Sequence, residues 1–326
     1  MSYFVTEESF GSLASCYEET RHELRWDPLF ILPGWMQVWW QQFDPGTQLQ
    51  LLAVRHDGQL LGIAPLQIEG GTASMIGSID VTDYVDFVVS PGREEAFFNV
   101  LLDHLKEKGA SCLDLGPLRP ESSVLMHLVN VARGRGYAVH SELEDVSLEL
   151  SLPSTWDGYL AALSKKQRHE VRRKLSRIHE AGEVIYRTLA ESSAIREAMD
   201  VFLKMFTESR NDKEAYLTAR REAFFRSIAA TMADWGLARI GVLDLNAQPA
   251  AMVLFFIHNN TVHLYNSAYD PNYRSLSAGL MSKVFCIRDS IEKGVQKFDF
   301  LKGNEEYKHR LGGIEVPLYR CHIDIR

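Results

Sequence analysis

Ten residues, 270–279, combine the residue types that bind an anion. They read Asp-Pro-Asn-Tyr-Arg-Ser-Leu-Ser-Ala-Gly and stand between a predicted strand and a predicted helix. The free N–H groups of a first helical turn attract negative charge, small residues let a phosphate approach, and an arginine adds a charge-assisted contact. These residues predict a phosphate site made of Arg274, Ser275, Ser277, Ala278 and Gly279. The alternative is an ordinary helix start, capped by one of the serines, with the glycine packing on a sheet.

A basic segment at residues 165–177 is the second candidate for anion binding. It holds seven Lys or Arg residues and one acidic residue. Its apolar residues recur at helical spacing, which predicts a helix that ends near residue 181. Arg168 and Arg172 lie four residues apart and so share a helix face. With Arg173 they are candidates to bind a phosphate-bearing acceptor, such as a nucleotide sugar, a lipid-linked saccharide or a tRNA. The alternative is a solvated helix face.

The overall composition limits the classes of protein. The 326 residues suffice for two domains, and 46% hydrophobic with 24% charged residues is ordinary for a globular protein. The formal net charge of −8 argues against a surface built to bind nucleic acid. The sequence predicts no oligomeric state.

Export, membrane and metal signals are missing from the sequence. The N-terminus shows no basic segment followed by an apolar run, and the longest apolar run, Ala250–Ile257, is far shorter than the ~20 residues of a membrane span. The cysteines show no Cys-x-x-Cys spacing and the histidines no His-Glu-x-x-His array. We expect a cytoplasmic protein with no transmembrane segment and no metal.

The two halves of the chain predict the same order of elements. Each has a strand pair around a turn, a further strand, a helix and a short buried strand. In the first half the helix stops at Gly109 and the short strand contains Asp114; in the second half the equivalents are Gly294 and Asp299. The glycine and the aspartate are five positions apart in both copies. This agreement predicts two related α/β units.

These motifs resemble a known family. Arg274-x-x-Ser-Ala-Gly279 after a strand is similar to the Arg/Gln-x-x-Gly-x-Gly/Ala loop that binds the coenzyme A pyrophosphate in the GCN5-related N-acetyltransferase (GNAT) superfamily. Ser277 replaces the first glycine of that pattern. The segments 265–279 and 293–312 resemble the tandem-domain acetyltransferases associated with cellulose and other polysaccharide biosynthesis, which are relatives of the FemAB peptidoglycan aminoacyltransferases. The resemblance covers nearly the whole chain.

The resemblance implies an α/β fold of two tandem GNAT-like domains, each a mixed twisted sheet flanked by helices. The expected domains are residues 1–150 and 151–326, the second with a helical entry segment. The equivalent turn of the first domain, residues 89–96, carries two acidic residues where a phosphate would lie. Because like charges repel, we expect the acyl-CoA or acetyl-CoA co-substrate in the second domain and no cofactor site in the first.

Acyl transfer needs a base, an acid for the leaving group and donors for the oxyanion. Asp299 is a candidate base, because apolar neighbours raise the pKa of a carboxyl group; the alternative is a structural carboxylate bonded to backbone. Tyr307 is a candidate acid for a thiolate, and Lys308 is a candidate to stabilise negative charge. Tyr265 is a further candidate acid. The alternatives are a packing tyrosine and an exposed lysine.

We therefore expect an acyltransferase that moves an acyl group from acyl-CoA to an amine or hydroxyl of a small acceptor. Only the resemblance indicates that this acceptor is related to saccharides. Two alternatives stay open. One is a FemAB-like aminoacyltransferase that uses aminoacyl-tRNA, although the long helical arm of that group is missing from the sequence. The other is a non-catalytic binding protein with the GNAT fold.

Overall fold

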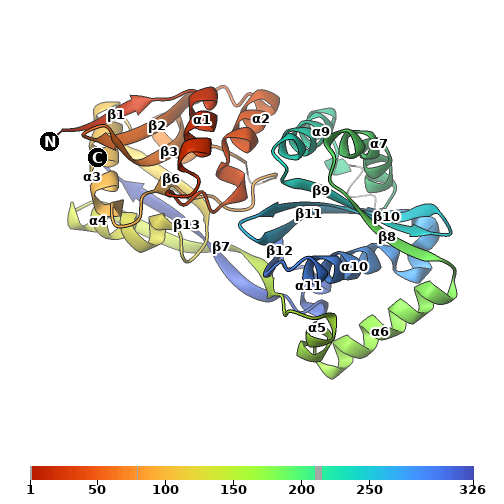
Figure 1. The fold of residues 1–326 in the computed structure, drawn as a ribbon. Helices are drawn as coiled ribbons and strands as arrows, with labels where there is room; N and C mark the ends of the chain where they lie inside the picture. The colour runs from red at the N-terminus through yellow and green to blue at the C-terminus, as the bar shows by residue number, and fades with distance from the viewer. Residues whose placement is uncertain (1, 79, 210–214) are drawn as a thin grey trace. The chain divides into compact units, whose positions relative to one another are not determined.

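A computed structural model describes residues 2–78, 80–209 and 215–326. The chain forms two compact units. The first comprises Met1–Val146 and Val316–Arg326, and the second comprises Ser147–Glu315. Each unit contains a β-sheet with helices packed against it (Figure 1). The last eleven residues, which the sequence placed in the second domain, therefore lie in the first unit.

The first unit is built from short helices and a mixed sheet. Its strands are β1 (Tyr3–Glu7), β2 (Gln48–His56), β3 (Gln59–Glu69), β4 (Thr72–Met75), β5 (Val88–Val89), β6 (Cys112–Leu118) and the first part of β7 (Ala138–Ser151). Its helices are α1 (Phe10–Thr20), η1 (Leu29–Ile31), α2 (Pro33–Phe43), α3 (Glu94–Glu107), η2 (Val124–Leu128) and α4 (Val129–Gly134). The strand order is β1-β2-β3-β4-β6, followed by the C-terminal strand β13 (Ile314–Asp324), and β4 and β6 run parallel.

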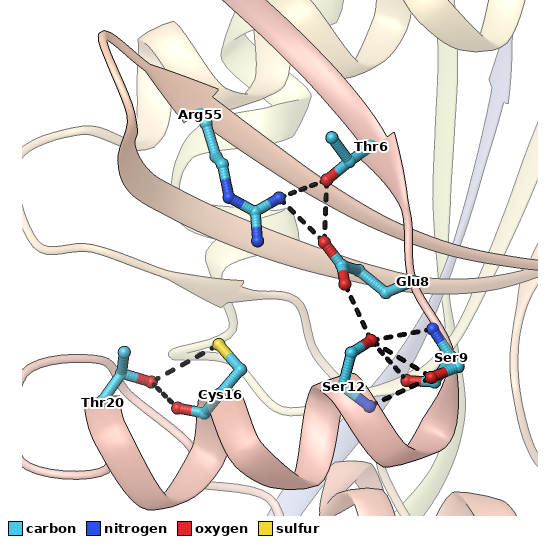
Figure 2. Close-up of polar contacts among 7 residues, drawn as sticks. All are labelled: Thr6, Glu8, Ser9, Ser12, Cys16, Thr20 and Arg55. Carbon is cyan, nitrogen blue, oxygen red and sulfur yellow. Dashed lines mark hydrogen bonds and ion pairs between the residues drawn. The ribbon is translucent and has the colours of Figure 1, made fainter.

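Local side-chain chemistry fixes the start of α1. Ser9 and Ser12 form a reciprocal capping box, which satisfies two N–H groups at the helix terminus. Glu8, just before the cap, accepts hydrogen bonds from Ser12 Oγ and from Nη1 of Arg55, at 2.8 Å each (Figure 2). Arg55 belongs to β2, so these contacts tie the helix start to the sheet. Figure 2 also shows Thr20 bonded back to Cys16 at the other end of α1.

The first unit contains an aromatic helix and the strand pair around a turn that the sequence predicted. Pro33 opens α2 at its first position, where the missing N–H costs nothing. Trp35 and Trp39 of α2 are buried, so these aromatic side chains face the core. Asp57 and Gly58 both take positive φ between β2 and β3, as a tight hairpin turn requires.

The second unit contains the longer helices. Its elements are α5 (Trp156–Ala162), α6 (Lys165–Glu180), β8 (Val184–Leu189), α7 (Ser192–Ser209), α9 (Ala219–Asp234), β9 (Ala238–Leu245), β10 (Gln248–His258), β11 (Thr261–Tyr269), η3 (Pro271–Leu276), α10 (Ala278–Glu292), β12 (Lys297–Lys302) and α11 (Glu306–Arg310). The strand order is β8-β9-β10-β11-β12, and the end of β7 pairs with β12. Helices α7 and α9 lie on one face of this sheet and α10 on the other (Figure 1).

The two units repeat one order of elements, with one exchange. The series β1-α1-α2-β2-β3-β4-α3-β6-α4-β7 matches β8-α7-α9-β9-β10-β11-α10-β12-α11-β13. Asp114 and Asp299 occupy equivalent places, each in the last residue pair of a parallel ladder. The last strand of each copy, however, contributes to the sheet of the other unit: β13 pairs with β6, and residues 147–151 of β7 pair with β12.

Candidate active site

The loop between β11 and α10 turns sharply at Ser277. Asp270 opens η3 by accepting a hydrogen bond from the N–H of Asn272, at 2.8 Å. Ser277 then adopts a left-handed conformation, with φ 57° and ψ 37°. This conformation favours glycine, and Ser277 stands where the family pattern has its first glycine. The side chain of Ser277 does not cap α10, so the ordinary serine cap is not what forms here.

The first turn of α10 contains two N–H groups without a hydrogen-bond partner among the described residues. The carbonyl of Ser277 accepts from the N–H groups of Leu280 and Met281, at 2.9 Å each. Over the ranges that the structure describes, the N–H groups of Ala278 and Gly279 have no hydrogen-bond partner. Two amides at a helix N-terminus, together with the helix dipole, attract negative charge.

Gly279 lets α10 approach β11 closely. A Cβ atom at this position would lie 2.8 Å from Cδ1 of Tyr269, a separation that side chains do not tolerate. Glycine at this position therefore allows close packing of α10 on β11 and also leaves its own backbone N–H uncovered by a side chain. Arg274 is exposed on η3 at the same loop.

Helix α6 contacts this loop through two cations that the sequence did not single out. Lys174 Nζ donates to Ser277 Oγ at 2.9 Å, and Arg177 Nη1 donates to the carbonyl of Ser275 at 3.3 Å. Both residues immediately precede apolar positions of α6, Leu175 and Ile178, so they flank the packed stripe. That position next to the stripe is the signal that could have identified them.

The three arginines named from the sequence have different surroundings. Arg168 is half-buried, whereas Arg172 and Arg173 are exposed. The structure records no hydrogen bond or ion pair for these three side chains with the residues it describes. The helix itself starts with a capping box of Ser164 and Gln167 and ends at Glu180, as the periodicity predicted.

The parallel strands β11 and β12 separate beyond His263 and Asp299. Their register contains three pairs, which run from Thr261 with Lys297 to His263 with Asp299. Beyond these pairs β11 continues beside β10 to Tyr269, while β12 pairs with β7 at Lys302. The residues that follow the separation are therefore carried by two diverging strands.

A buried lysine joins groups from both diverging strands. Lys283 of α10 donates from Nζ to Ser267 Oγ of β11 and to the carbonyl of Gly279, at 2.8 Å each. Its Nζ also lies 4.9 Å from the ring centroid of Tyr307, which follows β12. Lys283 lies in the otherwise mostly apolar run 280–287, and that contrast is the sequence signal that could have revealed it. Burial raises the pKa of Tyr307, so its phenol stays protonated at neutral pH.

Asp299 is fully buried and bonded to backbone. Its Oδ1 accepts from the N–H of Leu301 at 2.7 Å, and Leu301 has a positive φ of 63°. Nδ1 of His263 lies 3.9 Å from the other carboxylate oxygen. The contact with Leu301 supports the structural alternative for this carboxylate, since it holds an uncommon backbone turn at the end of β12.

Lys308 is also buried rather than exposed. Its Nζ donates to the carbonyls of Leu301, Lys302 and Gly303, at 2.9, 2.7 and 3.0 Å. It also lies 2.8 Å from a carboxylate oxygen of Glu305. An ammonium group has three N–H donors, so these contacts occupy its capacity. Tyr265, the remaining candidate, is half-buried and packs edge-on against Phe225.

The structure thus divides the candidate residues into two groups: one lies around the first turn of α10, and the other binds backbone at the end of β12. The loop residues 274–279, Lys283 and Tyr307 are linked through the first turn of α10. Asp299 and Lys308 hold the backbone after β12. Within the described ranges, no group of three or more His, Cys, Asp or Glu side chains is placed to bind a metal ion, and no helix is long and apolar enough to cross a membrane.

Comparisons with known proteins bear on the family and the fold of this chain. The family model of the acetyltransferase (GNAT) domain matches residues 165–309. No curated protein gives a significant match. Among solved structures, FemX superposes with a TM-score of 0.64 at 11% identity, covering 98% of this chain and 96% of FemX.

Two further structures have the same fold. The C-terminal domain of a putative lysylphosphatidylglycerol synthetase from Agrobacterium fabrum gives a TM-score of 0.62 at 12% identity, covering 97% of this chain and 92% of that domain. A protein of unknown function from Bacteroides thetaiotaomicron gives 0.63 at 13% identity, covering 99% of this chain and all of that protein.

The chain therefore has the α/β fold of two tandem GNAT-like domains that the sequence predicted. Residues 165–309 of its second unit match the model of the acetyltransferase (GNAT) domain, and its fold extends over nearly the full length of FemX.

Proposed function

We propose that this protein is an acyltransferase that takes its acyl group from acyl-CoA. The observation that carries the proposal is the 274–279 loop, where a left-handed Ser277 precedes two N–H groups, those of Ala278 and Gly279, that have no hydrogen-bond partner among the described residues. Arg274 lies in this loop, and Lys174 and Arg177 contact it. A pyrophosphate would find both amide donors and cations there.

Residues next to this loop supply the remaining chemistry. Tyr307 is the candidate acid for the departing thiolate, because a phenol is protonated at neutral pH and the Tyr307 ring lies beside Lys283 Nζ. Lys283, which contacts the Tyr307 ring and the Gly279 carbonyl, orders this part of the site. We assign Asp299 and Lys308 to positioning the end of β12, and Arg168, Arg172 and Arg173 to an acceptor with phosphate or hydroxyl groups. The saccharide-related acceptor rests on the sequence resemblance alone.

Calorimetric titration with acetyl-CoA tests the donor site. We expect the substitution Arg274→Glu to abolish binding, because it replaces a cation beside the phosphates by an anion. The matched control is Arg25→Glu, which makes the same change at an exposed arginine of the first unit and is expected to leave the affinity unchanged. Equal binding by both variants would show that the loop does not hold the donor.

The same titration separates the two alternatives. Binding of an aminoacyl-tRNA, with no binding of acetyl-CoA, would favour an aminoacyltransferase. Binding of neither donor would favour a binding protein that has kept the fold without catalysis. Mass spectrometry of molecules that co-purify with the protein would then identify the ligand.

A further inference from the structure

The first unit contains a polar cavity where its own parallel strands separate. Strands β4 and β6 pair from Thr72 with Cys112 to Ser74 with Asp114, and the ladder ends there. This is the place in the repeat where β11 and β12 part in the second unit. A cavity of about 250 Å³ lies at this point, lined by residues that include Ser74, Ser78, Thr82, Asp114, Glu144 and Arg320.

The charges in this cavity do not balance. Arg320 binds both oxygens of Asp114, with Nε–Oδ1 at 2.8 Å and Nη2–Oδ2 at 2.7 Å. Its Nη1 reaches Oε1 of Glu144 at 3.3 Å. Two carboxylates thus share one guanidinium, which leaves an excess of one negative charge among these three groups. A cationic ligand would neutralise it.

Two buried oxygens of the cavity walls lack partners. Oε2 of Glu144 and Oγ1 of Thr82 make no hydrogen bond with any residue that the structure describes. Thr82 is only 3% exposed. An unsatisfied buried polar atom costs about 1–3 kcal/mol, so such atoms usually mark a place that a ligand or an ordered water completes.

The size and lining of the cavity restrict the ligand. Pockets for drug-sized molecules measure roughly 300–1,000 Å³, so this smaller cavity suits one small ring or short chain rather than a nucleotide. The carboxylates can accept hydrogen bonds from the hydroxyl groups of a ligand, and the serine hydroxyls can both donate to them and accept from them. Val85 and Pro117 add an apolar wall against which C–H groups can pack.

We propose that the first unit binds the ammonium-bearing, hydroxylated part of a small molecule in this cavity, the chemistry of an amino sugar. Glu144 would receive the ammonium group, while Asp114 and Arg320 hold neighbouring hydroxyls. The proposal does not rest on the proposed acyl-CoA function, because every residue in it belongs to the first unit. Failure of one proposal leaves the other standing.

Saturation-transfer NMR with the full chain tests this site, using D-glucosamine, D-glucose and N-acetyl-D-glucosamine as probes. We expect D-glucosamine to bind at least tenfold more tightly than the two neutral sugars. The substitution Glu144→Gln should remove this preference. The control is Glu142→Gln, which changes an exposed carboxylate two residues earlier on β7 and should leave the preference intact.

A second variant covers the case in which Glu144→Gln does not fold. Ser74→Val places a larger side chain in the cavity wall, at a strand position that tolerates β-branched residues, and should weaken all binding. Acetyl-CoA affinity should not change in either variant. Three outcomes would overturn the proposal: no probe binds, charged and neutral sugars bind equally, or Glu144→Gln and Ser74→Val both bind D-glucosamine as the native protein does. The first of these would mean that solvent alone fills the cavity.

Discussion

Buried charged side chains at the end of β12 hold backbone rather than face an open site. The ammonium of Lys308 is shared by three successive carbonyls, and the carboxylate of Asp299 accepts the N–H of Leu301. Leu301 itself has a left-handed backbone. Asp299 and Lys308, which the sequence suggested as catalytic candidates, therefore bind backbone groups at the end of β12.

This interpretation of Lys308 can be separated from a catalytic one. The substitution Lys308→Met leaves three carbonyls with one fewer donor each, and we expect the free energy of unfolding in urea to fall by about 3 kcal/mol. The exposed Lys166→Met in α6 is the control and should change stability little. Unchanged stability of Lys308→Met with a large loss of turnover would instead make Lys308 a catalytic residue.

A half-buried carboxyl in the first unit makes stability depend on pH. Burial raises the pKa of Asp86 from 3.8 to about 6, although Ser123 donates to it from both its N–H and its Oγ. Between pH 4 and 6 the folded protein keeps a proton that the unfolded chain loses. Stability from this group therefore falls as pH rises through that window, by about 3 kcal/mol in all, and stays constant above it.

The substitution Asp86→Asn should remove this fall, because an amide does not titrate. Thermal unfolding at several pH values between 4 and 7 measures the difference between native protein and variant. Asp157→Asn, at an exposed aspartate in α5, is the matched control. A difference that does not change across the window would show that Asp86 is ionised throughout.

At the scale of elements, the candidate site depends on how tightly α10 packs against β11. Gly279 and Tyr269 are in contact there, and the same turn provides the unbonded amides and the carbonyl that Lys283 binds. A small displacement of this turn would move all of these groups together. The site is therefore sensitive to packing at a residue that carries no functional group.

The substitution Gly279→Ala tests this coupling. Its Cβ would lie 2.8 Å from the Tyr269 ring, so either the ring or the helix must shift. We expect calorimetry to show acetyl-CoA binding weakened by about tenfold, or about 1.4 kcal/mol. Gly11→Ala, where the nearest atom is 3.7 Å away in α1, is the control. Recovery of affinity in the double variant with Tyr269→Leu would confirm the steric cause, and undiminished binding by Gly279→Ala would contradict it.

At the scale of the whole molecule, the last strand of each repeat pairs with a strand of the other unit: β13 pairs with β6, and the end of β7 pairs with β12. Strand β13 buries Leu318, Cys321 and Ile323 completely, and it pairs with β6 of the first unit. Residues 316–324 are thus part of the sheet of the first unit.

The substitution Ile323→Ala tests the strand exchange. Truncating a fully buried isoleucine costs about 2–5 kcal/mol, and this cost should fall on the first unit. Hydrogen exchange should therefore quicken in β6 and change little in β11 and β12. Ile185→Ala in β8 removes an exposed isoleucine and should leave both units unaffected. Faster exchange in β11 and β12 with no change in β6 would contradict the assignment.

Many helices, strands and turns of this fold could be predicted from the sequence, because each depends on residues that are close together in the chain. The hairpin at Asp57 and Gly58, the basic helix that ends near residue 181 and the loop before α10 each depend on neighbouring residues. The repeat was also recognisable, since Gly109 and Gly294 precede their aspartates by the same spacing. Local backbone preferences and periodic burial determine such features without reference to the rest of the fold.

Partners that lie far apart in the sequence could not be read in this way. The sequence alone determined the α/β repeat, its helices and strands, and the loop suited to an anion. Only the tertiary structure decided that Lys174 contacts this loop, that Lys308 binds carbonyls and that β13 completes the first unit. The physical reason is that a buried charged side chain must form hydrogen bonds with the groups packed beside it. Long-range packing decides which groups those are, so the partners cannot be predicted from neighbouring residues in the sequence.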